Sequence, residues 1–149
     1  MKVAAIQMVS GVNLDANLGE ALRLLRQAAA CGAELAVLPE YFCFMGHRDE
    51  DKLAIAEVPG AGRVQEFLAA AARELGLWVV GGTLPLATDD PGHAANASLT
   101  FDPLGRPVTR YDKIHLFRYD NGRERYDEAA VLRAGDTPTG VDCTAADGQ

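Results

Sequence analysis

The sequence predicts an α/β protein whose sheet is parallel on one side and antiparallel on the other. Three short apolar runs, residues 3–8, 35–38 and 77–83, are typical of buried parallel strands, and a helical pattern lies between each successive pair. The alternating segments 96–101 and 108–114 then predict an antiparallel hairpin. A chain of 149 residues can bury a real core, so we expect one domain without an internal linker.

The first strand and helix are predicted by a change in apolar period. Residues 3–8 form a compact apolar run, whereas from Leu14 onward apolar residues recur at three- and four-residue spacing, as on one stripe of a helix. Gly32 ends that helix, and the run 35–38 follows it closely. Strand, helix and strand therefore form a βαβ unit with a right-handed crossover, and the two strands are parallel neighbours.

The same succession predicts a second βαβ unit. Residues 41–52 are interpreted as a loop over the strand ends, and residues 64–75 carry a second helical stripe. The run 77–83 is apolar on both faces and is the third predicted strand. Its paired glycines, Gly81 and Gly82, allow another stretch of backbone to approach closely.

The rest of the chain is predicted to combine the antiparallel hairpin with long polar connections. Residues 85–95 are interpreted as a polar loop that precedes the hairpin. Residues 115–130 form a charged, mostly irregular stretch, long enough to be a functional loop. Residues 139–143 are expected to begin a further strand, from which the last four residues turn away.

Composition and charge exclude several classes of function. Fourteen basic and twenty-one acidic residues give a net charge of −7, which would repel a nucleic-acid backbone. No apolar run approaches the roughly 18 residues needed to span a bilayer, and the apolar part of the N-terminus is too short for a signal peptide. We therefore expect a cytoplasmic protein with neither a nucleic-acid nor a membrane partner.

The cysteine and histidine patterns indicate neither a disulfide framework nor a metal site. Cys31, Cys43 and Cys143 are odd in number, widely separated and without CxxC spacing, so each is expected to be a free thiol. His47 stands beside three acids, but without a second nearby histidine this stretch is interpreted as a solvated face. No metal and no cofactor are expected.

Two charged residues are predicted to lie at strand ends. The second apolar run stops abruptly at Pro39 and Glu40, so a buried strand delivers a carboxylate to the edge where open α/β sheets carry their chemistry. The competing interpretation is that Pro39 and Glu40 merely open a helix. Period-two alternation places Lys113 on one side of the second hairpin strand, at its end, where a lysine is usually only solvated.

The residues around both positions resemble the nitrilase, or carbon–nitrogen hydrolase, superfamily. The glutamate motif is Leu38-Pro39-Glu40-Tyr41-Phe42, and the lysine motif is Tyr111-Asp112-Lys113-Ile114-His115-Leu116-Phe117. The resemblance runs from Lys2 to about Asp136 and includes Ala5-Ile6-Gln7, Val80-Gly81-Gly82-Thr83 and Arg133-Ala134-Gly135-Asp136. It implies an α-β-β-α sandwich of two sheets with helices outside, usually dimerised, of which this chain would supply the first sheet.

The resemblance also implies roles for individual residues. Members of the family use a glutamate as general base, a lysine to stabilise an oxyanion, and a cysteine that attacks a nonpeptide amide or nitrile carbon to form a thioester. Carried over, Glu40 is the base and Lys113 is the cation. Glu128 occupies the place of a second glutamate found in the family, with Glu124 and Asp127 as close competitors. The residue types suit this chemistry, because a carboxylate can activate a thiol and an ammonium can stabilise a developing oxyanion.

The nucleophile motif of the family, resembling G-x-x-x-C-Y-D-x-R-F, does not occur in the sequence. Cys143 lacks the surrounding residues, Cys43 is interpreted as a pocket wall and Cys31 as packing. We therefore expect residues 1–149 to be the N-terminal part of a single carbon–nitrogen hydrolase domain that ends before the nucleophile strand. As it stands, the chain is expected to be inactive and to expose apolar surface that favours association.

The expected function of the complete protein is hydrolysis of a small amide through a Glu-Lys-Cys mechanism. The segment from Glu40 to Lys113 looks closest to amidase-like members acting on deaminated glutathione or on ω-amides of dicarboxylates, and a nitrile is the alternative substrate. The expected partners are this small molecule and a second copy of the chain. The rival hypothesis is a noncatalytic remnant or interaction module that keeps the fold.

Overall fold

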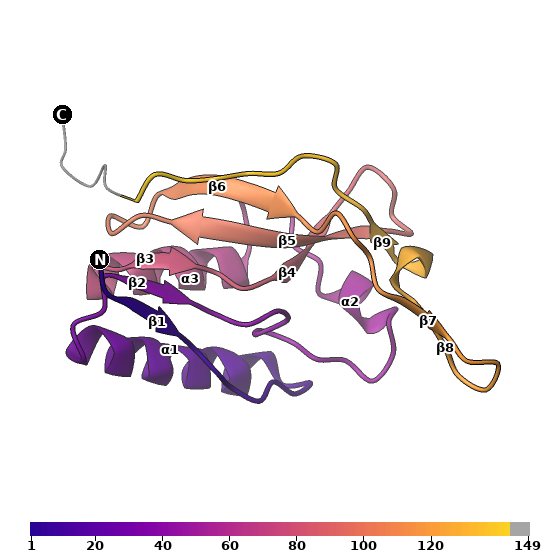
Figure 1. Cartoon of the computed structure of the whole chain (residues 1–149), viewed down its shortest axis with the longest axis horizontal. Coiled ribbons are helices and arrows are strands. Elements are labelled where there is room, and N and C mark those ends of the chain that lie inside the picture. The colour runs from indigo at the N-terminus through magenta and orange to yellow at the C-terminus, as the bar shows by residue number, and fades with distance from the viewer. Residues whose placement is uncertain (144–149) are drawn as a thin grey trace.

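A mixed sheet with helices packed against one face forms the body of the molecule (Figure 1). The computed structural model describes residues 1–143. The large sheet contains β1 (Val3–Ala5), β2 (Leu35–Val37), β3 (Trp78–Val80), β4 (Leu84–Ala87), β5 (Ala94–Phe101), β6 (Pro107–Asp112) and β9 (Leu132–Arg133). The helices are α1 (Leu14–Ala30), α2 (Asp51–Ala54) and α3 (Arg63–Leu75). A separate hairpin contains β7 (Arg118–Asp120) and β8 (Arg125–Asp127), and the single turn η1 (Glu128–Ala130) follows it.

The strand order confirms the two predicted βαβ units and the antiparallel extension. β1, β2 and β3 are parallel neighbours, in the register Val3 to Leu35 and Leu35 to Trp78. β3 pairs antiparallel with β5, where Val79 lies opposite Phe101. β5 also pairs antiparallel with β4 and with β6, so it is the strand on which the two parts of the sheet meet.

The two long helices begin and end where local chemistry dictates. The side chain of Asn13 accepts a hydrogen bond from the Ala16 N–H and caps α1. Gly76 ends α3 in the left-handed conformation, at φ 62°, which a residue without Cβ adopts without strain. The apolar stripes of both helices cover the face of the sheet that carries the main core. That core includes Leu18, Leu25, Leu68, Ala72, Ala36, Val79 and Leu99.

Three predictions about the connecting segments were wrong. The segment 85–95 is not simply a loop, because residues 84–87 form β4. Pro85 is tolerated there, since its carbonyl faces away from β5 and accepts the N–H of Glu57. The charged loop 41–52 includes the start of the short helix α2. Residues 139–143 form no strand, and the turn predicted for the last four residues lies outside the described part of the chain.

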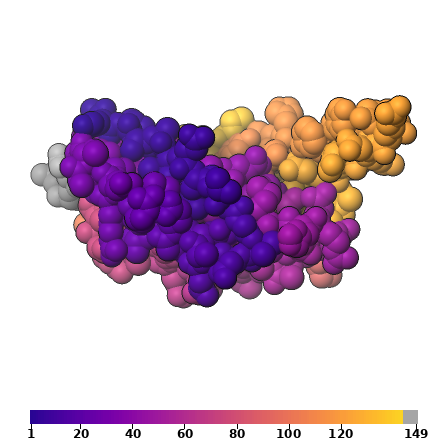
Figure 2. Space-filling model, turned by 90° about the horizontal axis from the view of Figure 1, so that it is seen from below, coloured from indigo at the N-terminus to yellow at the C-terminus, as the bar shows by residue number. Residues whose placement is uncertain are grey.

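The segment 115–130 is more regular than predicted. It contains the β7–β8 hairpin, which projects beyond the body of the molecule as the orange extension in Figure 2. Tyr119 lies opposite Tyr126, with ring centroids 6.4 Å apart, and Arg118 pairs with Asp127 across the strands. Within residues 1–143, no helix combines the length and hydropathy needed to cross a membrane.

Candidate active site

The chain turns sharply after β2 and presents Glu40 at the carboxyl end of the parallel strands. Leu38 is buried and still donates its N–H to Val80 O at 3.0 Å. Three residues later Tyr41 adopts φ 51°, a left-handed conformation that is uncommon for a residue with a side chain. The Tyr41 N–H donates to Thr83 Oγ1 at 2.9 Å, which fixes the turn against the end of β3.

Gly82 allows the two turns to approach. A Cβ at this position would lie 2.9 Å from the carbonyl carbon of Pro39, and Gly82 itself has φ 52°. Both the space and the backbone conformation therefore require glycine. Gly82, one of the paired glycines noted in the sequence, thus packs directly against Pro39, the residue that precedes Glu40.

Lys113 is held by main-chain bonds on both sides of its Cα. It follows β6 immediately, donates its N–H to Asn96 O at 2.9 Å and accepts the Gly135 N–H at 2.9 Å. Gly135 is packed so closely that a Cβ there would lie 2.8 Å from Asp112 Cβ. The backbone of Lys113 is consequently fixed in the sheet, while its side chain extends from the strand end.

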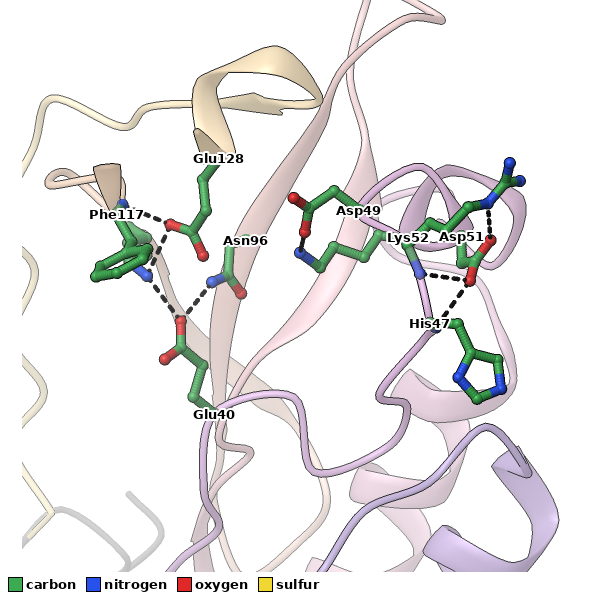
Figure 3. A network of polar contacts seen from close by, with 10 residues as sticks. Glu40, His47, Asp49, Asp51, Lys52, Asn96, Phe117 and Glu128 are labelled. Carbon is green, nitrogen blue, oxygen red and sulfur yellow. Dashed lines mark hydrogen bonds and ion pairs between the residues drawn. The ribbon is translucent and has the colours of Figure 1, made fainter. Parts of the chain in front are cut away.

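Glu128 reaches the same place from the base of the β7–β8 hairpin. The Glu128 N–H donates to Phe117 O at 3.0 Å, and the Phe117 N–H donates to Glu128 Oε2 at 2.7 Å. This reciprocal pair closes the hairpin and orients the carboxylate. Figure 3 shows Glu40, Asn96 and Glu128 converging from different parts of the fold.

The three residues predicted to form the site meet at the Lys113 ammonium. Its Nζ lies 3.0 Å from Glu40 Oε1 and 2.9 Å from Glu128 Oε2. The side chains of Glu40, Lys113 and Glu128 are 49%, 23% and 12% exposed, so the site opens to solvent on the side of Glu40. Their predicted convergence at one edge of the sheet is therefore confirmed.

The two competing acids do not contact Lys113. Asp127 Oδ2 pairs with Arg118 at 2.8 Å and with Arg125 at 3.3 Å. Glu124 lies at the exposed tip of the hairpin, where its N–H donates to Asn121 Oδ1. Of the three candidates for the second acid, Glu128 is the one that reaches the ammonium.

The charged form of Lys113 is favoured in this setting. Partial burial acts to lower the pKa of Lys113, but the hydrogen bonds and charges of Glu128 and Glu40 outweigh it and raise the pKa above the ordinary value. Lys113 thus stays an ammonium at neutral pH. The ammonium has three N–H donors, and two of them point to the carboxylates of Glu40 and Glu128. The third remains for another acceptor.

None of the three cysteines, all of which lie within residues 1–143, is placed to act beside Lys113. Cys43 is fully buried in the main core, and burial raises the pKa of its thiol to about 12. Cys143 lines a pocket with Met1 and Trp78 at the amino ends of the parallel strands, opposite the end that carries Glu40. Cys31 is exposed just after α1, near the same amino ends.

Residues around Glu40 that the sequence prediction missed complete the site. Asn96 is fully buried in β5, and its Nδ2 donates to Glu40 Oε1 at 2.8 Å. Lys52 Nζ pairs with Asp49 at 2.7 Å and lies 4.9 Å from the ring centre of Tyr41. The one feature of the sequence that could have singled out Asn96 is its polar side chain within the otherwise apolar run Ala94-Ala95-Asn96-Ala97.

The polar groups of the site offer hydrogen bonds but no metal cage. Within the described residues, no group of three or more His, Cys, Asp or Glu side chains is arranged to hold a metal ion. The main-chain N–H of His47 donates to Asp51 Oδ2 at 2.9 Å, so this stretch forms the entry of α2.

The Tyr41 hydroxyl is buried without a hydrogen-bond partner in the described structure. Burial, and then the carboxylates of Glu128 and Glu40, raise the pKa of Tyr41, which therefore stays neutral.

Comparisons with known proteins agree on one family and one fold. The carbon-nitrogen hydrolase family model matches residues 2–146. The chain is 33% identical over 132 residues to a deaminated glutathione amidase of Synechocystis, covering 87% of this chain and 48% of that protein. It is 35% identical over 134 residues to omega-amidase NIT2-B of Xenopus laevis, covering 87% and 46%. The crystal structure of Saccharomyces cerevisiae Nit3, a nitrilase superfamily member, matches 97% of this chain and 52% of its own, with 25% identity and a TM-score of 0.82.

The predicted fold class is thereby confirmed, and the chain covers only part of these structures. It spans about half the length of the curated relatives that it matches.

Proposed function

Because this chain belongs to the carbon–nitrogen hydrolase family, we propose that it carries the acid–base and oxyanion groups of a site that hydrolyses small amides. Glu40 is the general base, Lys113 stabilises the oxyanion, and Glu128 holds the ammonium from the other side. The observation that carries this proposal is the position of Lys113 Nζ, 3.0 Å from Glu40 Oε1 and 2.9 Å from Glu128 Oε2. This arrangement suits acyl transfer from an amide to a thiol.

The two oxygens of Glu40 have different roles in this proposal. Oε1 accepts hydrogen bonds from both Lys113 and Asn96, whereas Oε2 has no partner within residues 1–143. The free oxygen takes the proton of an attacking thiol, and the thiolate sulfur forms a bond to the amide carbon. The same proton then passes to the leaving nitrogen as the carbon–nitrogen bond breaks, so that ammonia departs and a thioester remains.

Water completes the turnover through the same carboxylate. Glu40 takes a proton from a water molecule, whose oxygen attacks the thioester carbon, and the sulfur leaves and is reprotonated. In both halves of the reaction the carbonyl oxygen gains negative charge. The third N–H donor of Lys113, which neither carboxylate occupies, is available to that oxygen. One such donor is worth about 3–4 kcal/mol of barrier in comparable sites.

The thiol in this proposal is not one of the cysteines at positions 31, 43 and 143. The buried position of Cys43, and the location of Cys143 at the amino ends of the strands, support a nucleophile supplied by chain beyond residue 149. We propose accordingly that residues 1–149 are part of one carbon–nitrogen hydrolase domain, and that the complete protein is a cytoplasmic dimer. No cofactor takes part in the proposed reaction.

The proposed substrate is a small amide, with a nitrile as the less favoured alternative. The relatives named as a deaminated glutathione amidase and an omega-amidase support an amide. The second candidate function is a noncatalytic remnant or interaction module. It is favoured by the observation that no cysteine of the chain lies beside Lys113.

The experiment that separates the two functions follows ammonia release from a panel of short ω-amides. The coding sequence downstream of codon 149 is read first, and any in-frame continuation is expressed together with the chain. We expect turnover in a protein that gains the cysteine motif and none in the 149-residue chain itself. An immediate natural stop would support the remnant.

Variants assign the roles. In the active protein, Lys113→Ala should abolish turnover, because it removes the oxyanion donor, while Lys2→Ala at the amino ends of the strands serves as the matched lysine control. Near-normal turnover in Lys113→Ala would remove Lys113 from the mechanism. Turnover by the 149-residue chain that disappears in Cys43→Ser or Cys143→Ser would show that the nucleophile had been misplaced.

A further inference from the structure

The side chain of Glu40 needs an external anchor to hold one orientation. It lies in a turn, is half exposed, and has three rotatable side-chain bonds, whose freedom favours several rotamers. A general base acts only within hydrogen-bond reach of the proton that it takes. Some other group must therefore restrict Glu40 before the reaction begins.

Lys113 is a poor anchor by itself. Its ammonium stands at the end of a flexible four-carbon stem and is shared between Glu40 and Glu128. Two long side chains that meet near solvent lose much of their attraction to the entropy of ordering both. The ion pair alone therefore does not define where the Glu40 carboxylate lies.

Asn96, in contrast, is fixed in the centre of the sheet. It is fully buried, its strand pairs with β4 at Pro85, and its carbonyl accepts the N–H of Lys113 at 2.9 Å. Its side chain has only two rotatable bonds, and its Nδ2 lies 2.8 Å from Glu40 Oε1 (Figure 3). The amide nitrogen must face Glu40, because an ionised carboxylate can only accept.

We propose that Asn96 is the positioning residue that fixes the Glu40 carboxylate relative to Lys113. One residue bonds both partners, Glu40 through its side chain and Lys113 through its main chain. Occupation of Oε1 by Asn96 and Lys113 also directs Oε2 to the open side of the site. This inference rests on the proposed function, since it explains how the proposed base is held.

The energetic cost of Asn96 supports a role beyond packing. Its Oδ1 is buried without a hydrogen-bond partner in the described structure. A buried acceptor left unpaired is unfavourable, and an apolar residue at this position would avoid that cost. A buried polar group that costs stability is expected where function requires it.

The test reads the orientation of Glu40 directly by nuclear magnetic resonance, with no need for turnover. In the 149-residue chain, three-bond couplings from Glu40 Cγ to the main-chain nitrogen and carbonyl carbon report whether χ1 occupies one rotamer. We expect one rotamer in the wild type and rotamer averaging in Asn96→Leu. Asn96→Ser, which is smaller, replaces Asn96→Leu if the latter does not fold.

Thr100→Val is the matched control, because Thr100 is buried on the same face of β5, four residues away, and does not contact Glu40. It should keep the single rotamer. In the reverse experiment, Glu40→Ala should shift the side-chain amide proton signals of Asn96. Averaging in the wild type, a fixed Glu40 in the Asn96 variants, or equal averaging in Thr100→Val would each overturn the proposal.

Kinetics then separate this inference from the proposed function. In a protein with turnover, Asn96→Ser should lower kcat by roughly tenfold to a hundredfold with little change in KM, as expected when a reacting group is misplaced by about 1 Å. A loss of rotamer order with unchanged kcat would leave Asn96 as the anchor and remove Glu40 from the mechanism. A change in KM alone would contradict the positioning role.

Discussion

Replacing Gly82 by alanine should displace the turn that presents Glu40. The added Cβ would clash most closely with Pro39 O, and it would also lie 2.9 Å from Pro39 C and from Leu38 O, whereas ordinary contacts begin at 3.4 Å. Because Pro39 O would lie closer still, the Pro39 backbone must move by more than the 0.5 Å that would relieve the contact with Pro39 C. Glu40 is the next residue, so the displacement passes directly to the proposed general base.

The energetic effect has two parts. A left-handed conformation costs a residue with Cβ about 1–2 kcal/mol, and Gly82 has φ 52°. Overpacking adds about 1–3 kcal/mol when the contact is with backbone, which cannot rotate away. We therefore expect Gly82→Ala to reduce the free energy of unfolding by roughly 2–5 kcal/mol.

Gly76→Ala is the matched control, because Gly76 has φ 62° and open space where its Cβ would stand. It should cost about 1–2 kcal/mol, the conformational part alone. Urea unfolding measures both variants, and hydrogen exchange of the Tyr41 amide reports whether its 2.9 Å bond to Thr83 Oγ1 is lost only in Gly82→Ala. Equal destabilisation by the two substitutions, with Tyr41 still protected, would refute the argument.

Three further predictions follow from the ionisable groups. The stability that the charge of Lys113 contributes should be fully present below the unfolded pKa of about 10.4 and lost as pH rises through the higher folded pKa. The unfolding free energies of the wild type and of Lys113→Met should therefore converge only in strong alkali. A thiol reagent at pH 8 should modify the exposed Cys31 quickly and the buried Cys43 only on unfolding, and fast labelling of Cys43 would contradict its place in the core. Asp102 is buried, and desolvation acts to raise its pKa, but hydrogen bonds from Arg106 outweigh that effect and lower the pKa. The stability of the wild type relative to Asp102→Asn should therefore be present above about pH 3.9 and lost as pH falls through the lowered folded pKa. Unfolding measured over an acid pH series will show this.

Long periodic segments were predictable because their patterns extend over several turns or strands. The apolar stripe beginning at Leu14 predicted α1 with an error of one residue at its C-terminal end. The alternation around Leu99 predicted β5. β4 was missed because it is only four residues long and contains Pro85, which in isolation argues against a strand. Its pairing with β5 overrides that local preference.

The hairpin and the partners of Glu40 were harder to predict for different reasons. β7 and β8 are exposed and held by Tyr119 against Tyr126 rather than by an apolar face, so they show no alternation of apolar residues. The turn residues Asn121 and Gly122 were the one local indication of a hairpin. The bond between Asn96 and Glu40 spans 56 residues, and no local pattern in either segment specifies it.

The distances along the chain between the site residues bear on how the site assembles during folding. Phe117 and Glu128 are 11 residues apart, whereas Glu40 and Lys113 are 73 apart. Closing the longer loop costs about 1.7 kcal/mol more chain entropy than closing the shorter one, from a dependence of (3/2)RT on the logarithm of loop length. The carboxylate of Glu128 is thus oriented by a local hairpin, whereas the pairing of Glu40 with Lys113 requires the longer and costlier closure. A partly folded chain can hold Glu128 in place and still have no site.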